Sequence, residues 1–262
     1  MPEPLTPDAD LLVELPSAAA GEDQDAEWCL VTTPDGRRRI RFHDYAEIYA
    51  IEGLYERLFY EELRCTSPTT VRGLIEEVLV EQDADPADLI VLDVGAGNGM
   101  VGEQLDDLGA SSIVGVDILQ EAADAAERDR PGVYDDYLVA DLTDPAPDDH
   151  AALAGAGFNC LTTVAALGFG DIPPAAFAQA FDYVRDGGLV SFTLKERFAN
   201  PRADESGFSR LLRELDDGGA LDVLVEHRYQ HRLSVAGEPL HYMAYVARKR
   251  GDAGDLPVAA GV

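Results

Sequence analysis

Short apolar runs that alternate with helical segments constrain the fold of this chain more than any other feature. The apolar runs span residues 89–94, 112–116, 137–140, 158–164 and 189–194. The helical segments between and after them span residues 98–109, 119–129, 147–155, 173–185 and 207–218. Buried strands that alternate with helices indicate right-handed βαβ units and a parallel sheet. The sequence therefore predicts an α/β fold with a doubly wound, mostly parallel sheet.

The two ends of this pattern are different. Two longer apolar strands, at 221–228 and 241–249, are joined by a turn at Ala236-Gly237 and predict a closing antiparallel hairpin. Before the sheet, residues 28–42 predict a short hairpin, and two helices are expected at 44–63 and at 67–82.

Composition divides the chain further. Residues 1–26 are rich in Pro, Ala, Asp and Glu and contain no basic residue, which predicts a poorly ordered acidic tail. We expect an N-terminal hairpin and helical lid or substrate segment at 27–86, the main domain at 87–250, and a loose C-terminal tail at 251–262.

A glycine-rich turn follows the first apolar run. Residues 93–99 read DVGAGNG, and glycines at such a strand-to-helix turn let the backbone bend tightly and approach a ligand. The turn alone is ambiguous, because Gly97, Gly99 and Gly102 also spell the dinucleotide pattern G-x-G-x-x-G. Asp93 favours a different ligand, since a carboxylate at the strand end suits a cationic amino group better than a pyrophosphate. In the simpler alternative, Asp93 only caps the turn.

Acidic residues also end the next two strands. Asp117 follows the second strand, at the place where a ribose-binding carboxylate belongs in a sheet of this kind, and a carboxylate can accept two hydrogen bonds from a diol. Asp141 follows the third strand, where it could accept from an adenine amino group. One strand-ending Asp is usually a turn residue. Three of them beside a glycine turn indicate a ligand site at the carboxyl edge of the sheet.

These residues resemble a known family. The first motif of class I S-adenosylmethionine-dependent methyltransferases reads acidic-x-Gly-x-Gly-x-Gly, and residues 93–99 match it at every fixed position. The resemblance extends over about residues 89–249. It implies a Rossmann-like fold, S-adenosylmethionine as the cofactor, and methyl transfer by in-line displacement.

The resemblance also implies roles for individual residues. Gly95, Gly97, Asn98 and Gly99 would form the cofactor loop with Asp93, and Asp117 would hold the ribose. Ile118 would pack on the adenine, and Asp141 and Leu142 would frame its polar edge. Thr163 would line the methyl-donor end. Tyr45 and Tyr49 resemble a Tyr-x-x-x-Tyr element that closes over the methionine moiety from an N-terminal helix.

The chain departs from the family pattern at two positions. Ala50 follows the second tyrosine where many members have Asp, and Asn159 stands near the start of the fourth strand where Asp is common. The Asn-Pro-Pro-Tyr and Asp-Pro-Pro-Tyr motifs of enzymes that methylate nucleic-acid or glutamine amino groups are missing from the sequence. No catalytic residue can be assigned.

The charge of the chain also argues against a nucleic acid as the methyl acceptor. The formal net charge is −30 and the only lysines are Lys195 and Lys249, so phosphate backbones and anionic membranes are disfavoured as partners. A small-molecule acceptor is therefore expected. A second interpretation treats the acidity as a solubility trait of halophilic-like proteins from a salt-rich cytoplasm, with no bearing on the substrate.

The remaining features suggest a cytoplasmic protein. The three cysteines are far apart and match neither a disulfide framework nor a metal site, so no metal is expected. No signal peptide or membrane-spanning run is visible. Two other functions stay open: a cofactor-binding but non-catalytic regulatory module, to which Ala50 and Asn159 would point, and an NAD(P)-dependent oxidoreductase. Oligomeric state is not predicted.

Overall fold

The computed structural model describes residues 11–16, 24–34, 36–168, 171–199, 204 and 206–253. The chain forms two compact units. The first contains the residues up to Thr66 together with 230–240, and the second contains 67–229 and the residues from 241 onward. The observed boundary at Thr66 lies before the expected one at residue 86, because the helix that begins at Ser67 packs in the same core as the main sheet.

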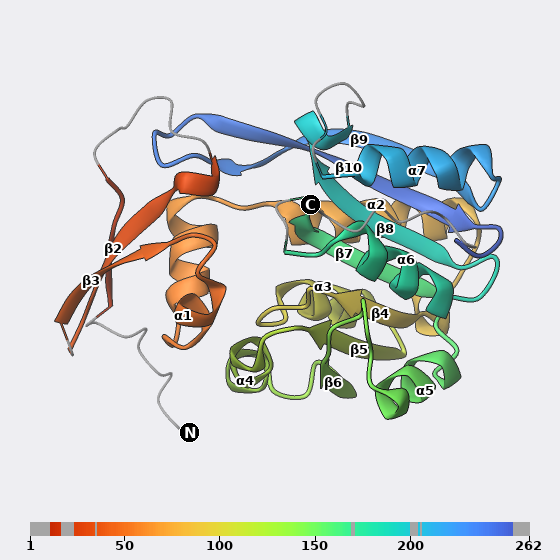
Figure 1. Cartoon of the computed structure of the whole chain (residues 1–262), viewed down its shortest axis with the longest axis horizontal. Helices are drawn as coiled ribbons and strands as arrows, with labels where there is room; N and C mark the ends of the chain where they lie inside the picture. Colours follow the sequence, from red (N-terminus) through yellow and green to blue (C-terminus); the bar gives the residue numbers. More distant parts are fainter. Residues whose placement is uncertain are drawn as a thin grey trace. The chain divides into compact units, whose positions relative to one another are not determined.

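The second unit is built on a seven-stranded sheet in the order β6-β5-β4-β7-β8-β10-β9 (Figure 1). The strands are β4 (Ile90–Val94), β5 (Ser112–Asp117), β6 (Asp136–Val139), β7 (Cys160–Leu167), β8 (Leu189–Lys195), β9 (Leu221–Leu233) and β10 (Pro239–Lys249). β4 to β8 are mutually parallel, and β10 runs antiparallel to β8. The predicted α/β fold, with its closing hairpin, is confirmed.

Helices alternate with the strands as the sequence predicted (Figure 1). They are α2 (Ser67–Glu81), α3 (Met100–Leu108), α4 (Gln120–Asp129), α5 (Pro147–Gly155), α6 (Pro174–Tyr183) and α7 (Phe208–Asp217). Side chains of α5, α6 and α7 share one apolar core with the sheet, and side chains of α2 and α3 share another. Helices on both faces explain why the central strands β4, β7 and β8 are buried along almost their whole length.

The strand order places a switch point between β4 and β7. From β4 the chain proceeds outward to β5 and β6, and it then returns to the other side of β4 to form β7 and β8. Loops that leave the carboxyl ends of β4 and β7 therefore diverge, which opens a ligand crevice in sheets of this type. The glycine turn begins there, directly after Val94.

Asn159 joins β4 to β7 at the opposite, amino end of these strands. Its side-chain Oδ1 accepts from the Ile90 N–H at 2.7 Å, and its Nδ2 donates to the Asp88 carbonyl at 2.7 Å. An amide can do both, whereas an ionised carboxylate can only accept. Asn159 thus has a structural reason to differ from Asp, and it lies away from the carboxyl edge of the sheet.

The first unit contains a three-stranded antiparallel sheet, β1 (Leu12–Glu14), β2 (Trp28–Thr33) and β3 (Gly36–Arg41). The β2–β3 hairpin is the predicted one. β1 lies inside the stretch expected to be an acidic tail, and its pairing with β2 through Val13 and Val31 differs from that expectation. The other parts of the predicted tails, residues 1–10, 17–23 and 254–262, lie outside the described residues.

A buried ion pair holds the tip of the β9–β10 hairpin, which belongs to the first unit, against Glu27. Arg232 Nη2 lies 2.6 Å from Glu27 Oε2, and both side chains are almost completely buried. The second Glu27 oxygen accepts from the Val235 N–H at 2.8 Å. Removing either charge would leave the other buried without its partner, which is strongly destabilising in general.

Aromatic residues divide the helix predicted over 44–63. The structure has a short α1 (Tyr45–Tyr49) and then a π-helical segment (Glu56–Glu62). The Tyr55 ring stacks on Tyr49, with centroids 5.1 Å apart, and lies tilted against Phe59 at 4.8 Å, so the three rings pack together. The wider π-helical turn is uncommon, and packing of these rings is the tertiary influence that local helix propensity does not contain.

The Asn159→Asp variant tests the structural role of the amide. We expect it to lower the free energy of unfolding by about 1–3 kcal/mol, because the Asp88 carbonyl loses its donor and a buried charge is introduced. Thermal unfolding at neutral pH measures the loss as a melting temperature several degrees lower. An unchanged melting temperature would show that the hydrogen bond from the Asn159 amide to the Asp88 carbonyl contributes nothing to stability.

Candidate functional site

The glycine turn leaves β4 with a left-handed backbone. Gly95, Gly97 and Gly99 have φ values of 71°, 56° and 90°, a region that L side chains rarely adopt. Gly95 is also hemmed in, since an added Cβ would lie 2.8 Å from Ile172 Cδ1 and 2.9 Å from Ala166 Cβ. The Gly95 and Ala96 N–H groups both point to the Val116 carbonyl. The turn is thus tied to the end of β5.

Asp117 ends β5 directly beside this turn. Its Oδ2 accepts from the Gly97 N–H at 3.0 Å, and its Oδ1 accepts from the Leu119 N–H at 3.1 Å. Burial raises the pKa of this carboxyl group, and the backbone N–H donors oppose the rise. Each oxygen keeps a further lone pair, so the group can still accept two hydrogen bonds from a diol.

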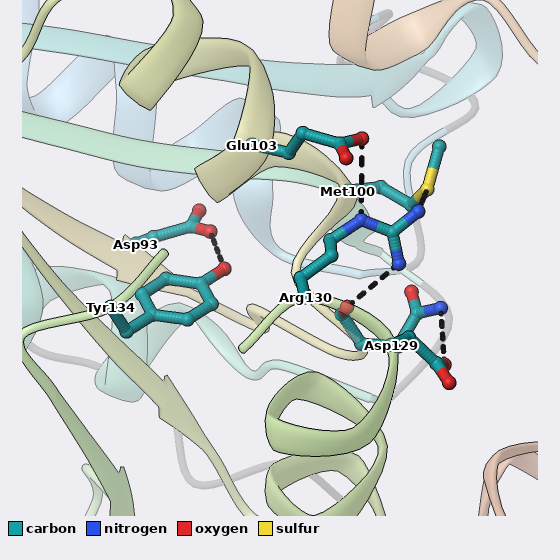
Figure 2. A network of polar contacts seen from close by, with 7 residues as sticks. Asp93, Met100, Glu103, Asp129, Arg130 and Tyr134 are labelled. Carbon is teal, nitrogen blue, oxygen red and sulfur yellow. Dashed lines mark hydrogen bonds and ion pairs between the residues drawn. The ribbon is translucent and has the colours of Figure 1, made fainter. Parts of the chain in front are cut away.

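Asp93 lies beneath the turn and is 1 % exposed. Its Oδ1 accepts from Thr162 Oγ1 at 2.8 Å and its Oδ2 from the Tyr134 hydroxyl at 2.9 Å, the second of which Figure 2 shows. Burial raises the pKa of Asp93 to about 6, and the two donors oppose that rise. Both oxygens are engaged with protein groups, so the expected contact with a ligand ammonium stays a prediction.

Arg130 holds the outer part of the turn. Its guanidinium donates to the Asn98 carbonyl at 3.0 Å and to Glu103 Oε2 at 3.3 Å, and it contacts the Met100 sulfur (Figure 2). The Asn98 side chain is buried and donates to Asp129 Oδ2 at 3.3 Å. Asn98, which was predicted to belong to the cofactor loop, therefore orders that loop through its own side chain.

The residues expected around an adenine ring lie next to Asp117 and at the end of β6. Ile118 is 59 % exposed, which is unusual for a large apolar side chain and leaves a face for a flat apolar group. Asp141 is exposed, and its Oδ1 accepts from the Thr143 N–H and hydroxyl, which lowers its pKa. This is the geometry of a turn residue. Leu142 is buried in the core. Their contacts with adenine stay predictions.

Thr163 lies in the middle of β7, where the strand becomes irregular, one residue beyond the pair of Thr162 with Asp93 of β4. The pairing with β8 shifts register between Thr163 and Leu167, and Ala165 has φ 59°, a strained value for a residue with a Cβ. The Thr163 hydroxyl is buried and has no hydrogen-bond partner among the described residues. A buried hydroxyl without a partner is costly, and a polar ligand group beside it would remove that cost.

Tyr45 and Tyr49 belong to the first unit. Their rings stack with centroids 6.1 Å apart, and Tyr49 is buried in the aromatic stack described above. Their predicted contact with the cofactor concerns the relation between the two units and stays a prediction.

The sequence analysis missed two tyrosines that support the turn, Tyr134 and Tyr137. The Tyr137 hydroxyl donates to the Gly97 carbonyl at 2.7 Å. A Cβ on Gly102 would lie 2.6 Å from Tyr134 Cζ, so the third glycine of the ambiguous G-x-G-x-x-G pattern makes room for Tyr134. Gly115 was the signal in the sequence for such a contact, because a glycine inside a buried strand often marks the close approach of another group, here the Tyr137 ring.

These observations fit an adenosyl cofactor at the carboxyl edge of β4, β5 and β7. A carboxylate with spare lone pairs and an exposed apolar side chain come from the end of β5, and a buried hydroxyl without a partner among the described residues comes from β7. In the described part of the chain, no group of His, Cys, Asp and Glu is arranged to hold a metal ion. No helix in that part has the length and apolar character needed to cross a bilayer.

Comparison with known proteins identifies the family. The sequence matches the methyltransferase-domain family over residues 67–232, more than half of its length. The chain belongs to this family. The predicted resemblance to S-adenosylmethionine-dependent methyltransferases is therefore confirmed, and S-adenosylmethionine is the cofactor of that class. No protein of a curated set matches the chain significantly.

Two solved structures share the fold. One is the N-methyltransferase NodS from Bradyrhizobium japonicum, whose structure is a complex with S-adenosyl-L-homocysteine. It is 15 % identical with a TM-score of 0.55, covering 80 % of this chain and 98 % of that chain. The other, an S-adenosylmethionine-dependent methyltransferase from Clostridium acetobutylicum, is 13 % identical with a TM-score of 0.50, covering 76 % and 97 %. At these identities the likeness concerns the fold.

The raised pKa of Asp93 predicts a pH-dependent stability. Because the folded pKa, about 6, exceeds the ordinary 3.8, the contribution of Asp93 is fully present below pH 4 and is lost as pH rises through 6. We compare the wild type with Asp93→Asn, which does not ionise. The unfolding free energy of the wild type, relative to that of the variant, should fall by about 1–2 kcal/mol from pH 5 to pH 7.5.

Denaturant unfolding of both proteins across this range measures the difference, and effects of the other carboxylates cancel in the comparison. A constant difference between the two proteins would mean that Asp93 does not change its ionisation in this window.

Proposed function

We propose that this protein transfers a methyl group from S-adenosylmethionine to a small-molecule acceptor. The cofactor would bind at the carboxyl edge of β4, β5 and β7, with Asp117 on the ribose hydroxyls, Ile118 against the adenine and Thr163 near the methyl-donor end. The activated methyl group is supplied by the cofactor when it is bound. The protein's own residues hold the reactants in line and exclude water.

The arrangement around Asp117 carries the proposal. One carboxylate is fixed by two backbone N–H groups, of Gly97 and Leu119, and the next residue is the exposed Ile118. An adenosine requires a group that accepts hydrogen bonds from its ribose diol and an apolar surface for its adenine. Asp117 and Ile118 provide the two side by side. The glycine turn brings backbone close to the same place without side chains in the way.

The alternatives have less support. The G-x-G-x-x-G pattern favoured an oxidoreductase, but Gly102 has a local explanation in the packing of Tyr134. Asn159 favoured a non-catalytic module, but its two hydrogen bonds at the amino end of the sheet account for the amide. Membership in the methyltransferase-domain family favours the enzyme over both.

The proposed acceptor class rests on charge. A chain with a net charge of −30 repels the phosphates of nucleic acids at moderate salt, so a small neutral or cationic acceptor suits it better. No general base is proposed. Glu196, a candidate by position at the end of β8, is exposed and forms an ion pair with Arg228.

The Asp117→Ala variant tests the cofactor site. It should weaken binding of S-adenosylmethionine by about 1–3 kcal/mol, the scale of hydrogen bonds to a charged group. Calorimetric titration of the wild type with S-adenosylmethionine, S-adenosylhomocysteine and NADH, in a salt-rich buffer, should show saturable binding of the first two and none of NADH.

Asp222→Ala is the matched control, because it also removes one negative charge and breaks an exposed ion pair with Arg250. It should bind the cofactor like the wild type. Equal affinity of a folded Asp117→Ala variant would exclude the ribose contact, and binding of NADH alone would replace the methyltransferase with the oxidoreductase. S-adenosylhomocysteine release with small oxygen, nitrogen and sulfur nucleophiles then tests turnover.

A further inference from the structure

Two tyrosines, Tyr134 just before β6 and Tyr137 within β6, fill a socket lined by glycines. A Cβ on Gly102 of α3 would lie 2.6 Å from the Tyr134 ring, and a Cβ on Gly115 of β5 would lie 2.8 Å from the Tyr137 ring. The rings contact each other edge to face, with centroids 5.3 Å apart. The socket therefore accepts these rings only because the two facing positions have no side chain.

The hydroxyl groups of both rings reach the cofactor turn. Tyr137 donates to the Gly97 carbonyl at 2.7 Å, and the Gly97 N–H donates to Asp117 at 3.0 Å. Gly97 is thus held on both sides. Tyr134 donates to Asp93 at 2.9 Å, at the point where β4 passes into the turn (Figure 2).

Ring packing alone would not require these hydroxyls. Phenylalanine fills nearly the same volume, and both hydroxyls are directed to protein acceptors. Burial raises the pKa of both tyrosines; Asp93 adds to the rise for both, and Asp117 adds to it for Tyr137. Donors buried beside carboxylates stay protonated and keep donating. Their acceptors are two atoms of the segment that would carry the cofactor, which connects these tyrosines to binding as well as to stability.

We propose that Tyr134 and Tyr137 are positioning residues for cofactor binding. Tyr137 acts through Gly97 on Asp117, and Tyr134 acts through Asp93 on the start of the turn. This inference rests on the proposed function, since it assumes that the turn and Asp117 hold S-adenosylmethionine. Without the Tyr137 hydroxyl, the backbone at Gly97 regains the freedom of a glycine, and Asp117 loses the fixed orientation that a ribose needs.

The variants Tyr137→Phe and Tyr134→Phe remove one hydroxyl each and keep the ring. Each should raise the Kd for S-adenosylhomocysteine about tenfold, the effect of losing one hydrogen bond of typical strength. Tyr183→Phe is the matched control, because its hydroxyl is bonded to His150 Nδ1 at 2.8 Å on α5, away from the turn. It should lower the melting temperature similarly and leave the Kd unchanged.

A double-mutant cycle separates positioning from general stability. If Tyr137 acts through Asp117, then Tyr137→Phe should change the Kd less than threefold when Asp117 is already Ala. The same holds for Tyr134→Phe in an Asp93→Asn background. If the fold-changes in Kd of the two single variants instead multiply in the double variant, the two residues act independently and the proposed positioning role is wrong.

The outcomes distinguish a failure of the proposed function from a failure of the positioning role. If the wild type binds neither S-adenosylmethionine nor S-adenosylhomocysteine, the proposed function fails. If the wild type binds both and the two Tyr→Phe variants bind as tightly as it does, the proposed function stands and the positioning role is wrong. A loss of affinity that Tyr183→Phe shares would likewise assign the effect to stability and overturn the proposal.

Discussion

The hydrogen bond from the Gly97 N–H to Asp117 joins the two strand ends on which the candidate site depends. It connects the turn after β4 to the end of β5, and it exists only because the backbone at Gly97 takes a left-handed conformation. The same carboxylate caps the start of the segment leading to α4 through Leu119. One side chain therefore sets the turn and the next loop, and any ligand that uses it meets a group already oriented.

This arrangement concentrates negative charge at the edge of the sheet. Burial raises the pKa of both Asp93 and Asp117. The charge of Asp117 adds to the rise at Asp93, and that of Asp171 adds to the rise at Asp117. Backbone and hydroxyl donors offset part of the cost. A cofactor with a cationic sulfonium and an ammonium group would offset more of it than an anionic dinucleotide, which would add to the repulsion. The electrostatics of the site and the family assignment thus favour the same ligand class.

Most of the second unit follows from patterns that are local in sequence. Each apolar run of residues 89–194 became a parallel strand, and the segments between them became helices, because burial on both faces selects continuous apolar strands. The hairpin of β9 and β10 was recognisable from the turn at Ala236-Gly237 between two strand-like runs. The first unit was less predictable. The break between Tyr49 and Glu56 depends on how rings from distant turns stack, and β1 is a strand only because β2 lies beside it. Local propensity contains neither influence.

The candidate site likewise has one part that the sequence predicts and one part that only the structure shows. Glycines and strand-ending carboxylates are visible as a motif, but the groups that hold them are visible only in space. Tyr134 and Tyr137 are separated from Asp93 and Gly97 by a whole βαβ unit, and their partners Gly102 and Gly115 could equally mark a ligand, as the ambiguous dinucleotide pattern showed. Position along a parallel strand resolves such cases. Asn159, just before β7, is explained by its hydrogen bond to Ile90 of β4. The buried Thr163 hydroxyl, further along β7 and beside the carboxyl end of β4, has no hydrogen-bond partner among the described residues. Asn159 therefore serves the fold, whereas the Thr163 hydroxyl is available to form a hydrogen bond with a ligand.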